Sequence, residues 1–417
     1  MRLPPWIINH TEEILREVLR LAGPADGSLS FYFRSHPKLG SRERGVIAEA
    51  VYSVLRNKRF YTDFSESGGG ATMRRLALLG LADTVGTDSL GGLLPEESEW
   101  LEGVMKVDRS LLPPAMRAEM PQWLLERLTA QYGEEQALQL ADALNRPAPL
   151  DLRVNSLKAT REEVIEALKQ APIACELMPY APLGLRVYKK PALQNLPLFK
   201  SGAIEVQDEG SQLLSQIVGA KRGEMVTDFC AGAGGKSLAL GAMMRNSGRL
   251  YAFDISDKRL AKLKPRLARS GLSNVHPVRI AHENDAKIKR LAGKMDRVLV
   301  DAPCSGLGTL RRNPDIKWRQ SPEAIEELRA KQAVILSSAA RMVKVGGRLV
   351  YATCSLLQEE NEDVVAQFLA THPDFALVPM KEVLAEQRIA LDMQDYLKLL
   401  PHLHQTDGFF AAVLTRK

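Results

Sequence analysis

Cysteine is scarce in this sequence. Its 417 residues include four cysteines, at Cys175, Cys230, Cys304 and Cys354, and no two of them form a CxxC pair. This spacing excludes a zinc finger and a paired disulfide framework. We therefore expect reduced thiols that either pack as small apolar side chains or take part in chemistry.

Long apolar runs are also missing. The most apolar region, 76–95, is broken by Asp83 and Asp88, and no run reaches the roughly 18 uncharged apolar residues of a membrane-spanning helix. The N-terminal residues lack the apolar core of a signal peptide. With 45% hydrophobic and 25% charged residues, the composition is that of a globular protein, and the length predicts two or three domains. We expect a cytoplasmic monomer without membrane contact.

Charge is distributed unevenly along the chain. Residues 251–350 hold 21 basic and 10 acidic side chains, whereas residues 1–145 hold 16 and 20. A basic segment beside acidic ones fits a surface that faces a polyanion, because each phosphate contact releases counterions. Solvated Lys-rich helices give the same pattern, so charge alone leaves both interpretations open.

Hydrophobic periodicity divides the chain into three parts. Residues 1–145 show helical spacing, which predicts an all-α domain of five or more helices. A proline pair at Pro147 and Pro149 marks a boundary, and 146–206 reads as a small α+β segment. In 207–417, five apolar runs alternate with helical segments, which predicts an α/β domain with a doubly wound parallel sheet.

The first apolar run ends in a glycine-rich turn. Gly232, Gly234 and Gly235 let the backbone approach a ligand and expose amide groups. A phosphate loop needs glycine at the position of Cys230, and a dinucleotide loop needs it at the position of Ser237. Neither ATP hydrolysis nor NAD binding is therefore favoured, which also disfavours an NAD-type oxidoreductase.

Acidic residues follow the next two runs. Asp254 is placed to accept hydrogen bonds from ribose hydroxyls, and Asp285 is placed near an adenine edge. Together with the glycine turn, they indicate an adenosine cofactor without a phosphate chain, a description that S-adenosylmethionine matches. The alternative interpretation is that both aspartates cap helices and bind no ligand.

Two cysteines follow the fourth and fifth runs. Asp301 and Cys304 end one run and Cys354 ends the other, and the strand ends of a doubly wound sheet open into one crevice. These groups suit methylation of cytosine at carbon 5. A thiolate that adds to carbon 6 makes carbon 5 nucleophilic, and a carboxyl group near N3 favours the addition.

Five strings in this order resemble the RsmB (Sun/Fmu) family of RNA cytosine-C5 methyltransferases over about 146–417: QDEGSQLL, DFCAGAGGKS, DAPCSGLGTLRRNPDIKWR, YATCSLLQEEN and DGFFAAVL. The helical start is similar to the NusB-like RNA-binding domain of that family. The resemblance implies a Rossmann-like class I methyltransferase domain, an RRM-like substrate-recognition role for 146–206, and 16S ribosomal RNA as substrate. A tRNA substrate and a non-catalytic ribosome-assembly factor are the alternatives.

The resemblance also implies site residues. Cys354 is expected to attack carbon 6, Cys304 to assist release of the methylated base, and Asp301 to contact N3. Ala233 replaces a proline frequent in the family, a small departure. The expected S-adenosylmethionine site comprises Cys230, Ala231, Gly232, Ala233, Gly234, Gly235, Lys236, Asp254, Asp285 and Asp301.

Cations and one tryptophan lie directly downstream of Cys304. They are suited to clamp phosphates and stack on a base, although a charged loop before a helix would look the same. The predicted RNA contacts are Arg311, Arg312, Lys317, Trp318 and Arg319. His402 and His404 lack a third metal ligand, so no metal is expected.

Overall fold

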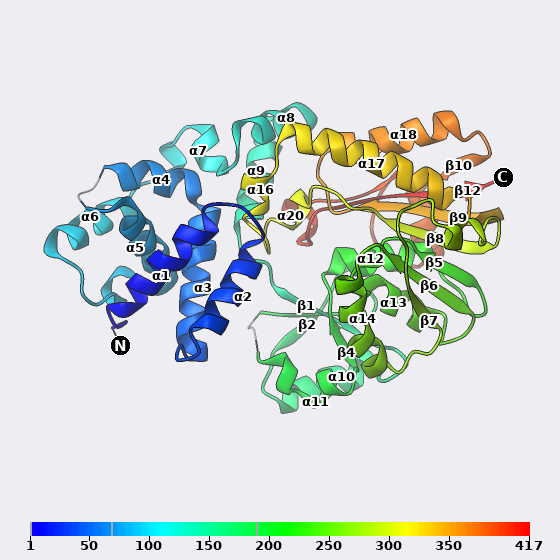
Figure 1. The fold of residues 1–417 in the computed structure, drawn as a ribbon, viewed down its shortest axis with the longest axis horizontal. Helices are drawn as coiled ribbons and strands as arrows, with labels where there is room; N and C mark the ends of the chain where they lie inside the picture. The colour runs from blue at the N-terminus through cyan, green and yellow to red at the C-terminus, as the bar shows by residue number, and fades with distance from the viewer. Residues whose placement is uncertain (1, 68–69, 189–190) are drawn as a thin grey trace. The chain divides into compact units, whose positions relative to one another are not determined.

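The computed structural model describes residues 2–67, 70–188 and 191–417 (Figure 1). Its internal contacts group the chain into two compact units. The helical unit comprises the chain through Pro147 together with Thr309–Ser321, and the sheet unit comprises Ala148–Gly308 with Pro322–Lys417. In the described part of the chain, no helix combines the length and apolarity needed to cross a membrane.

The helical unit confirms the all-α prediction for the start of the chain. Its helices are α1 (Trp6–Val18), α2 (Ala25–Ser35), α3 (Ser41–Arg56), α4 (Lys58–Glu66), α5 (Thr72–Val85), α6 (Pro95–Met105), α7 (Pro114–Ala118), α8 (Gln122–Tyr132), α9 (Glu134–Asn145) and α16 (Ile316–Arg319). Helices α3 and α5 pack closely in its core. Gly80 permits this approach, because a Cβ there would lie 2.6 Å from the carbonyl oxygen of Ala50.

The segment Thr309–Ser321 is built into the core of the helical unit. Lys317 is fully buried, and its Nζ donates hydrogen bonds to the Arg56 carbonyl at 3.0 Å and to Asn145 Oδ1 at 2.7 Å. The indole of Trp318 donates to the Leu55 carbonyl at 2.7 Å. Because the amine of Lys317 is enclosed by protein, it cannot reach an RNA phosphate, and we do not propose Lys317 as an RNA contact.

The sheet unit begins with a small antiparallel sheet. Its order is β2 (Cys175–Leu177), β3 (Gly184–Val187), β1 (Leu150–Val154) and β4 (Ile204–Val206). Helix α10 (Arg161–Gln170) starts at a capping box, in which Thr160 and Glu163 each bond the other's backbone amide. This part matches the predicted α+β segment and groups with the larger sheet in one compact unit.

The larger sheet contains the five predicted apolar runs as parallel strands. These are β5 (Met225–Asp228), β6 (Arg249–Asp254), β7 (Val275–Arg279), β8 (Met295–Asp301) and β9 (Val343–Thr353), in the spatial order β9-β8-β5-β6-β7. Strands β10 (Phe375–Val378), β11 (Leu397–Leu399) and β12 (Phe409–Arg416) extend it; β12 pairs antiparallel with β9, and β10 and β11 with β12. The strand order reverses between β5 and β8, where such sheets bind their ligands.

Helices cover both faces of this sheet. On β8, Leu299 packs into one core with helices α12 (Glu209–Val218), α13 (Gly235–Met243), α14 (Asp257–Ser270) and α19 (Met380–Glu386). Its neighbours Val298 and Val300 pack into the other with α15 (Ala286–Lys289), α17 (Pro322–Ala340) and α18 (Glu362–Thr371). Since side chains alternate across a strand, both faces are buried. This confirms the doubly wound α/β fold.

Candidate active site

The glycine turn joins β5 to α13. Gly234 has φ +82°, and a Cβ there would lie 2.1 Å from a methyl of Leu263, so both backbone conformation and packing demand glycine. Gly232 also has a left-handed φ of +56°, but a Cβ there would meet nothing within 4 Å. The turn is therefore packed against Leu263 at Gly234, whereas space is left beside Gly232.

Asp254 ties the end of β6 to this turn. Its Oδ2 accepts the amide hydrogen of Gly232 at 2.8 Å, and its Oδ1 accepts that of Ser256 at 2.7 Å. Asp285 instead caps α15 by accepting the Lys287 amide at 2.9 Å, and it also accepts the Ala281 amide at 2.9 Å; these two bonds lower the pKa of its carboxyl. The structure thus brings Asp254 to the glycine turn, whereas these hydrogen bonds of Asp285 lie within its own loop.

Asp228, at the carboxyl end of β5, is a buried acid that the sequence did not single out. Ser237 Oγ donates to its Oδ2 at 2.6 Å, while its Oδ1 has no partner in the described part of the protein. Burial is the main cause that raises the pKa of Asp228 to about 7, and the charges of Asp301 and Asp254 add to it. The carboxyl beneath the glycine turn is thus protonated below neutral pH.

Replacing Asp228 by asparagine is expected to change how stability depends on pH. Native Asp228 keeps its proton up to about pH 7, whereas the unfolded carboxyl loses it near the ordinary value of 3.8. The stability it contributes is complete below that value and is lost as pH rises toward 7. In Asp228→Asn the side chain at this position does not titrate. The unfolding free energy of the variant minus that of the wild type should therefore increase by about 2–3 kcal/mol between pH 5 and pH 8. Urea unfolding followed by circular dichroism measures this; a difference independent of pH contradicts it.

Lys236 and Asp301 form an ion pair that spans two strand ends. Lys236 Nζ lies 2.7 Å from Asp301 Oδ2, and it lies 5.8 Å from the ring centre of Phe409. Burial alone lowers the pKa of Lys236, but attraction to Asp301 and to Cys354 outweighs burial, and the pKa is raised. The sequence had indicated Lys236 only as part of the glycine turn, because nothing local shows where its ammonium group points.

The two cysteines at the ends of β8 and β9 are direct neighbours. The Sγ atoms of Cys304 and Cys354 lie 3.4 Å apart, and the Cys354 amide also donates to Cys304 Sγ at 3.3 Å. Both side chains are partly exposed. The hydrogen bond to Cys354, then burial and the nearby charge of Glu360, raise the pKa of Cys304, which favours its thiol form.

Cys230, the remaining cysteine of the predicted site, is also partly exposed. Cys230 packs against the core on one face of the sheet. Burial, followed by the charges of Asp228 and Asp301, raises its pKa. Its thiol is therefore suited to packing, and the backbone of the turn is what Cys230 offers to a ligand.

A close backbone crossing holds the cysteine loops together. The Gly308 amide donates to the Cys354 carbonyl at 2.8 Å, and the Gly408 amide donates to the Gly308 carbonyl at 2.8 Å. A Cβ on Gly308 would lie 2.1 Å from the Gly408 carbonyl oxygen, so only glycine permits this crossing. The segment DGFFAAVL, which contains Gly408, thereby contacts the loop of Cys304, although it lies about 100 residues further along the sequence.

The predicted RNA contacts lie in the segment that belongs to the helical unit. Arg319 is exposed and pairs with Asp315 at 3.2 Å. Arg311 and Arg312 are partly exposed. Trp318 is partly buried against the core of the helical unit, with Lys58 stacked 5.0 Å from its ring centre.

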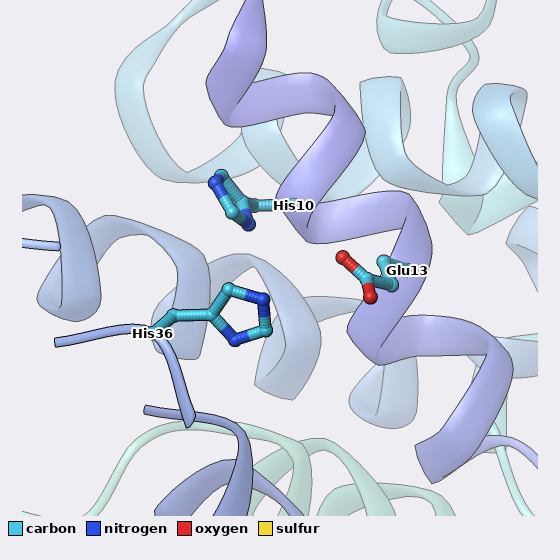
Figure 2. A group of neighbouring side chains, drawn as sticks. All are labelled: His10, Glu13 and His36. Atoms are coloured by element: carbon cyan, nitrogen blue, oxygen red, sulfur yellow. The ribbon is translucent and has the colours of Figure 1, made fainter. Parts of the chain in front are cut away.

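Another polar group lies in the helical unit and was not seen in the sequence. His10, Glu13 and His36 each place one nitrogen or oxygen within 4.8 Å of the others. Figure 2 shows His10 and Glu13 on one helix, with His36 facing them from another segment. The Tyr32 hydroxyl lies 2.6 Å from His10 Nδ1 and donates to Glu13 Oε2 at 2.7 Å. Hydrogen bonding through Tyr32 accounts for this group, and we assign no ion to it.

Comparisons with known proteins identify the family to which this chain belongs. The family model described as 16S rRNA methyltransferase RsmB/F matches residues 215–415, and a model described as the ferredoxin-like domain of RsmF/B-like methyltransferases matches residues 120–194. A Synechocystis protein named "Probable ribosomal RNA small subunit methyltransferase B" is 32% identical and covers 97% of this chain and 98% of its own length. Ribosomal RNA small subunit methyltransferase B of Yersinia pseudotuberculosis is 34% identical and covers 84% of this chain and 76% of its own length.

Solved structures show the same fold. A methyltransferase homologue from Pyrococcus horikoshii is 28% identical, with a TM-score of 0.64 over 75% of this chain and 100% of its own. NSun6 from the same organism, solved with SFG, is 23% identical, with a TM-score of 0.63 over 71% of this chain and 98% of its own, and supports the fold alone. From the full-length sequence relationships, the chain belongs to the RsmB/F family of ribosomal RNA small subunit methyltransferases.

Proposed function

We propose that this protein methylates carbon 5 of a cytosine in 16S ribosomal RNA through a covalent bond between Cys354 and carbon 6 of the base. The observation that carries this proposal is the pair of sulfurs 3.4 Å apart at the ends of β8 and β9. Asp301, which ends β8, is paired at 2.7 Å with Lys236, and the ammonium group of Lys236 is also attracted to Cys354. Cytosine C5 methylation needs a nucleophile at carbon 6, an acid near N3, and a group that assists release.

The glycine turn and Asp254 fit S-adenosylmethionine. The open space at Gly232 leaves room for a ligand against the backbone, and Asp254 is already oriented by the amide of Gly232. The proposed binding residues are those expected from the sequence, 230–236 with Asp254, Asp285 and Asp301. When bound, S-adenosylmethionine supplies an electrophilic methyl group.

We assign the other roles in the reaction to side chains of the protein. Cys354 attacks carbon 6 as its thiolate, and the proton that Lys236 shares with Asp301 passes through the Asp301 carboxyl group to N3, where it neutralises the negative charge that develops. Lys236 holds Asp301 in place through their ion pair. After a base has taken the carbon 5 proton and the bond between carbon 6 and Cys354 breaks, Cys304, which lies in contact with Cys354, assists release of the methylated base.

RNA binding is proposed for the parts outside the large sheet. The helical residues 1–145 would act as a NusB-like RNA-binding domain, and 146–206 as a substrate-recognition segment. Arg311, Arg312 and Arg319 supply charge that is partly or fully exposed, and Trp318 offers a partly exposed ring for stacking on a base. Such cations bind phosphates without reading sequence.

A methyl-transfer assay tests the proposal. Purified protein is incubated with S-adenosylmethionine labelled in the methyl group and with 16S rRNA, small ribosomal subunits or tRNA, and the RNA is digested to nucleosides. We expect label in 5-methylcytidine from 16S rRNA or the subunit. Cys175→Ser, which changes a thiol on β2 of the small sheet, serves as the matched control and should retain activity. Label only in tRNA overturns the substrate assignment, and label in another nucleoside overturns the chemistry.

A further inference from the structure

A buried carboxylate lies behind the two cysteine loops. Glu360 follows β9 and is fully buried. Its Oε1 accepts the Ser305 amide at 2.8 Å, and its Oε2 accepts the Ser305 hydroxyl at 2.5 Å and also the Ser355 hydroxyl. The two serines directly follow Cys304 and Cys354, so one side chain is bonded to both loops.

A third segment completes the surroundings of this carboxylate. Gln332 on α17 donates from its Nε2 to Glu360 Oε1 at 2.9 Å and to the Pro303 carbonyl at 3.0 Å. The Tyr351 hydroxyl donates to the Glu360 carbonyl at 2.6 Å. Glu360 is therefore held by the sheet and by a helix, and its position is not free to follow the loops.

Asn361, the residue after Glu360, also forms hydrogen bonds to the Cys354 loop. Asn361 Oδ1 accepts the Thr353 hydroxyl at 2.5 Å, and its Nδ2 donates to the Ser355 carbonyl at 3.1 Å. These bonds are made on either side of Cys354, to the residues before and after it. Asn361 thus fixes one loop, whereas Glu360 connects the two.

Energetics favour a specific role for Glu360. Burying a carboxylate is costly unless donors surround it, and here the donors come from Ser305, Ser355 and Gln332. Hydrogen bonds to a carboxylate are short and strong. An apolar side chain could fill the same space, but it could not accept a hydrogen bond from either serine, whereas Oε2 of Glu360 accepts from both hydroxyls.

We propose that Glu360 is a positioning residue that holds the sulfurs of Cys304 and Cys354 side by side for the two-thiol reaction. This inference rests on the proposed function. It assigns Glu360 no contact with substrate, and its effect passes through Ser305 and Ser355. Loss of the carboxylate should separate the loops while leaving the glycine turn and Asp254 intact, since Glu360 bonds to neither.

The spacing of the thiols can be measured without any methyl transfer. Phenylarsine oxide binds a pair of adjacent thiols by exchanging its oxygen for two As–S bonds, with release of water and no change in oxidation state. Wild-type protein should bind it tightly, and Cys304→Ser gives the reference for a single thiol. In Glu360→Ala the second sulfur is no longer held next to the first, so affinity should fall by about tenfold or more.

Kinetics provide the second readout. In Glu360→Ala we expect kcat to fall about 100-fold, the scale on which small misplacements of reacting groups act. The affinity for S-adenosylmethionine should be unchanged, which a general loss of structure would not allow. Glu360→Gln keeps one acceptor oxygen and should lie between the wild type and Glu360→Ala in both readouts.

A matched control is another fully buried glutamate of the same unit. Glu209 accepts the Tyr180 and Ala181 amides at 2.7 and 2.9 Å, so these hydrogen bonds tie it to a loop other than the two cysteine loops. Glu209→Gln should leave arsenical affinity and kcat unchanged. If Glu360→Ala does not fold, Ser305→Ala and Ser355→Ala each remove one hydroxyl contact and should each weaken arsenical binding.

The outcomes separate the two proposals. Wild-type arsenical affinity in Glu360→Ala, or in both serine variants, overturns the positioning role. Wild-type protein that binds the arsenical through Cys304 and Cys354 but forms no 5-methylcytidine overturns the proposed function, while the effect of Glu360 on the thiols stands on the arsenical data alone.

Discussion

Replacing Cys354 by alanine is expected to lower the rate of methyl transfer by about 10⁴-fold or more. Without the sulfur, no covalent bond to carbon 6 can form, and carbon 5 stays a poor nucleophile. S-adenosylmethionine should still bind, because the glycine turn and Asp254 do not depend on the thiol. Label transfer to RNA and equilibrium binding of S-adenosylmethionine measure the two quantities separately.

The partner thiol gives the control. In Cys304→Ala, Cys354 can still attack, but release is impaired, so a covalent protein–RNA adduct should accumulate and resist denaturing electrophoresis. The double variant should form no adduct. Turnover retained in Cys354→Ala, or an adduct that persists without Cys354, contradicts the roles proposed for the two sulfurs.

The largest effect on stability is expected from Glu119→Ala in the helical unit. Glu119 is buried and accepts the amides of Arg59 and Phe60, at 2.8 and 3.1 Å, at the start of α4. Its charge also attracts buried Lys317, whose pKa is lowered by burial to about 7. Removing the carboxylate leaves two backbone donors without their acceptor and takes away the negative charge that favours the ammonium form of Lys317, so the unfolding free energy should fall by about 3–5 kcal/mol.

The chain offers a selective probe for this measurement. All four tryptophans, Trp6, Trp100, Trp123 and Trp318, lie in the helical unit, so tryptophan fluorescence follows that unit alone. Urea titration of the full chain should give an earlier fluorescence transition in Glu119→Ala. Glu119→Gln retains an acceptor oxygen and should be affected less. An unchanged midpoint in Glu119→Ala would show that the buried carboxylate contributes nothing to the stability of the helical unit.

The sequence was sufficient for the parts of the site that follow from strand ends. Asp254, Asp301, Cys304 and Cys354 were predicted to converge because each ends an apolar run and parallel strands share one carboxyl edge. The structure confirms the parallel sheet and places the two sulfurs in contact. This inference needed only the order of the runs and the residue after each.

Side chains that act over long sequence distances could not be predicted in this way. Glu360 stands in the string LQEEN next to Glu359, and nothing local distinguishes the buried member from its neighbour. Lys317 lies among cations and a tryptophan, a composition typical of RNA contact, yet its ammonium group bonds Arg56 and Asn145. Burial of a charge depends on tertiary partners, and those partners lie far away in the sequence.

The grouping of Thr309–Ser321 with the helices has a consequence for how this protein can be divided. The chain leaves the sheet unit after Gly308, enters the helical unit, and returns at Pro322. A fragment that starts at residue 148 would carry Lys317 and Trp318 without the backbone carbonyls of Arg56 and Leu55 that they bond. A cut at residue 148 therefore does not separate the two units. A chimaera that exchanged only residues 1–147 would leave Thr309–Ser321, part of the helical unit, behind in the original chain.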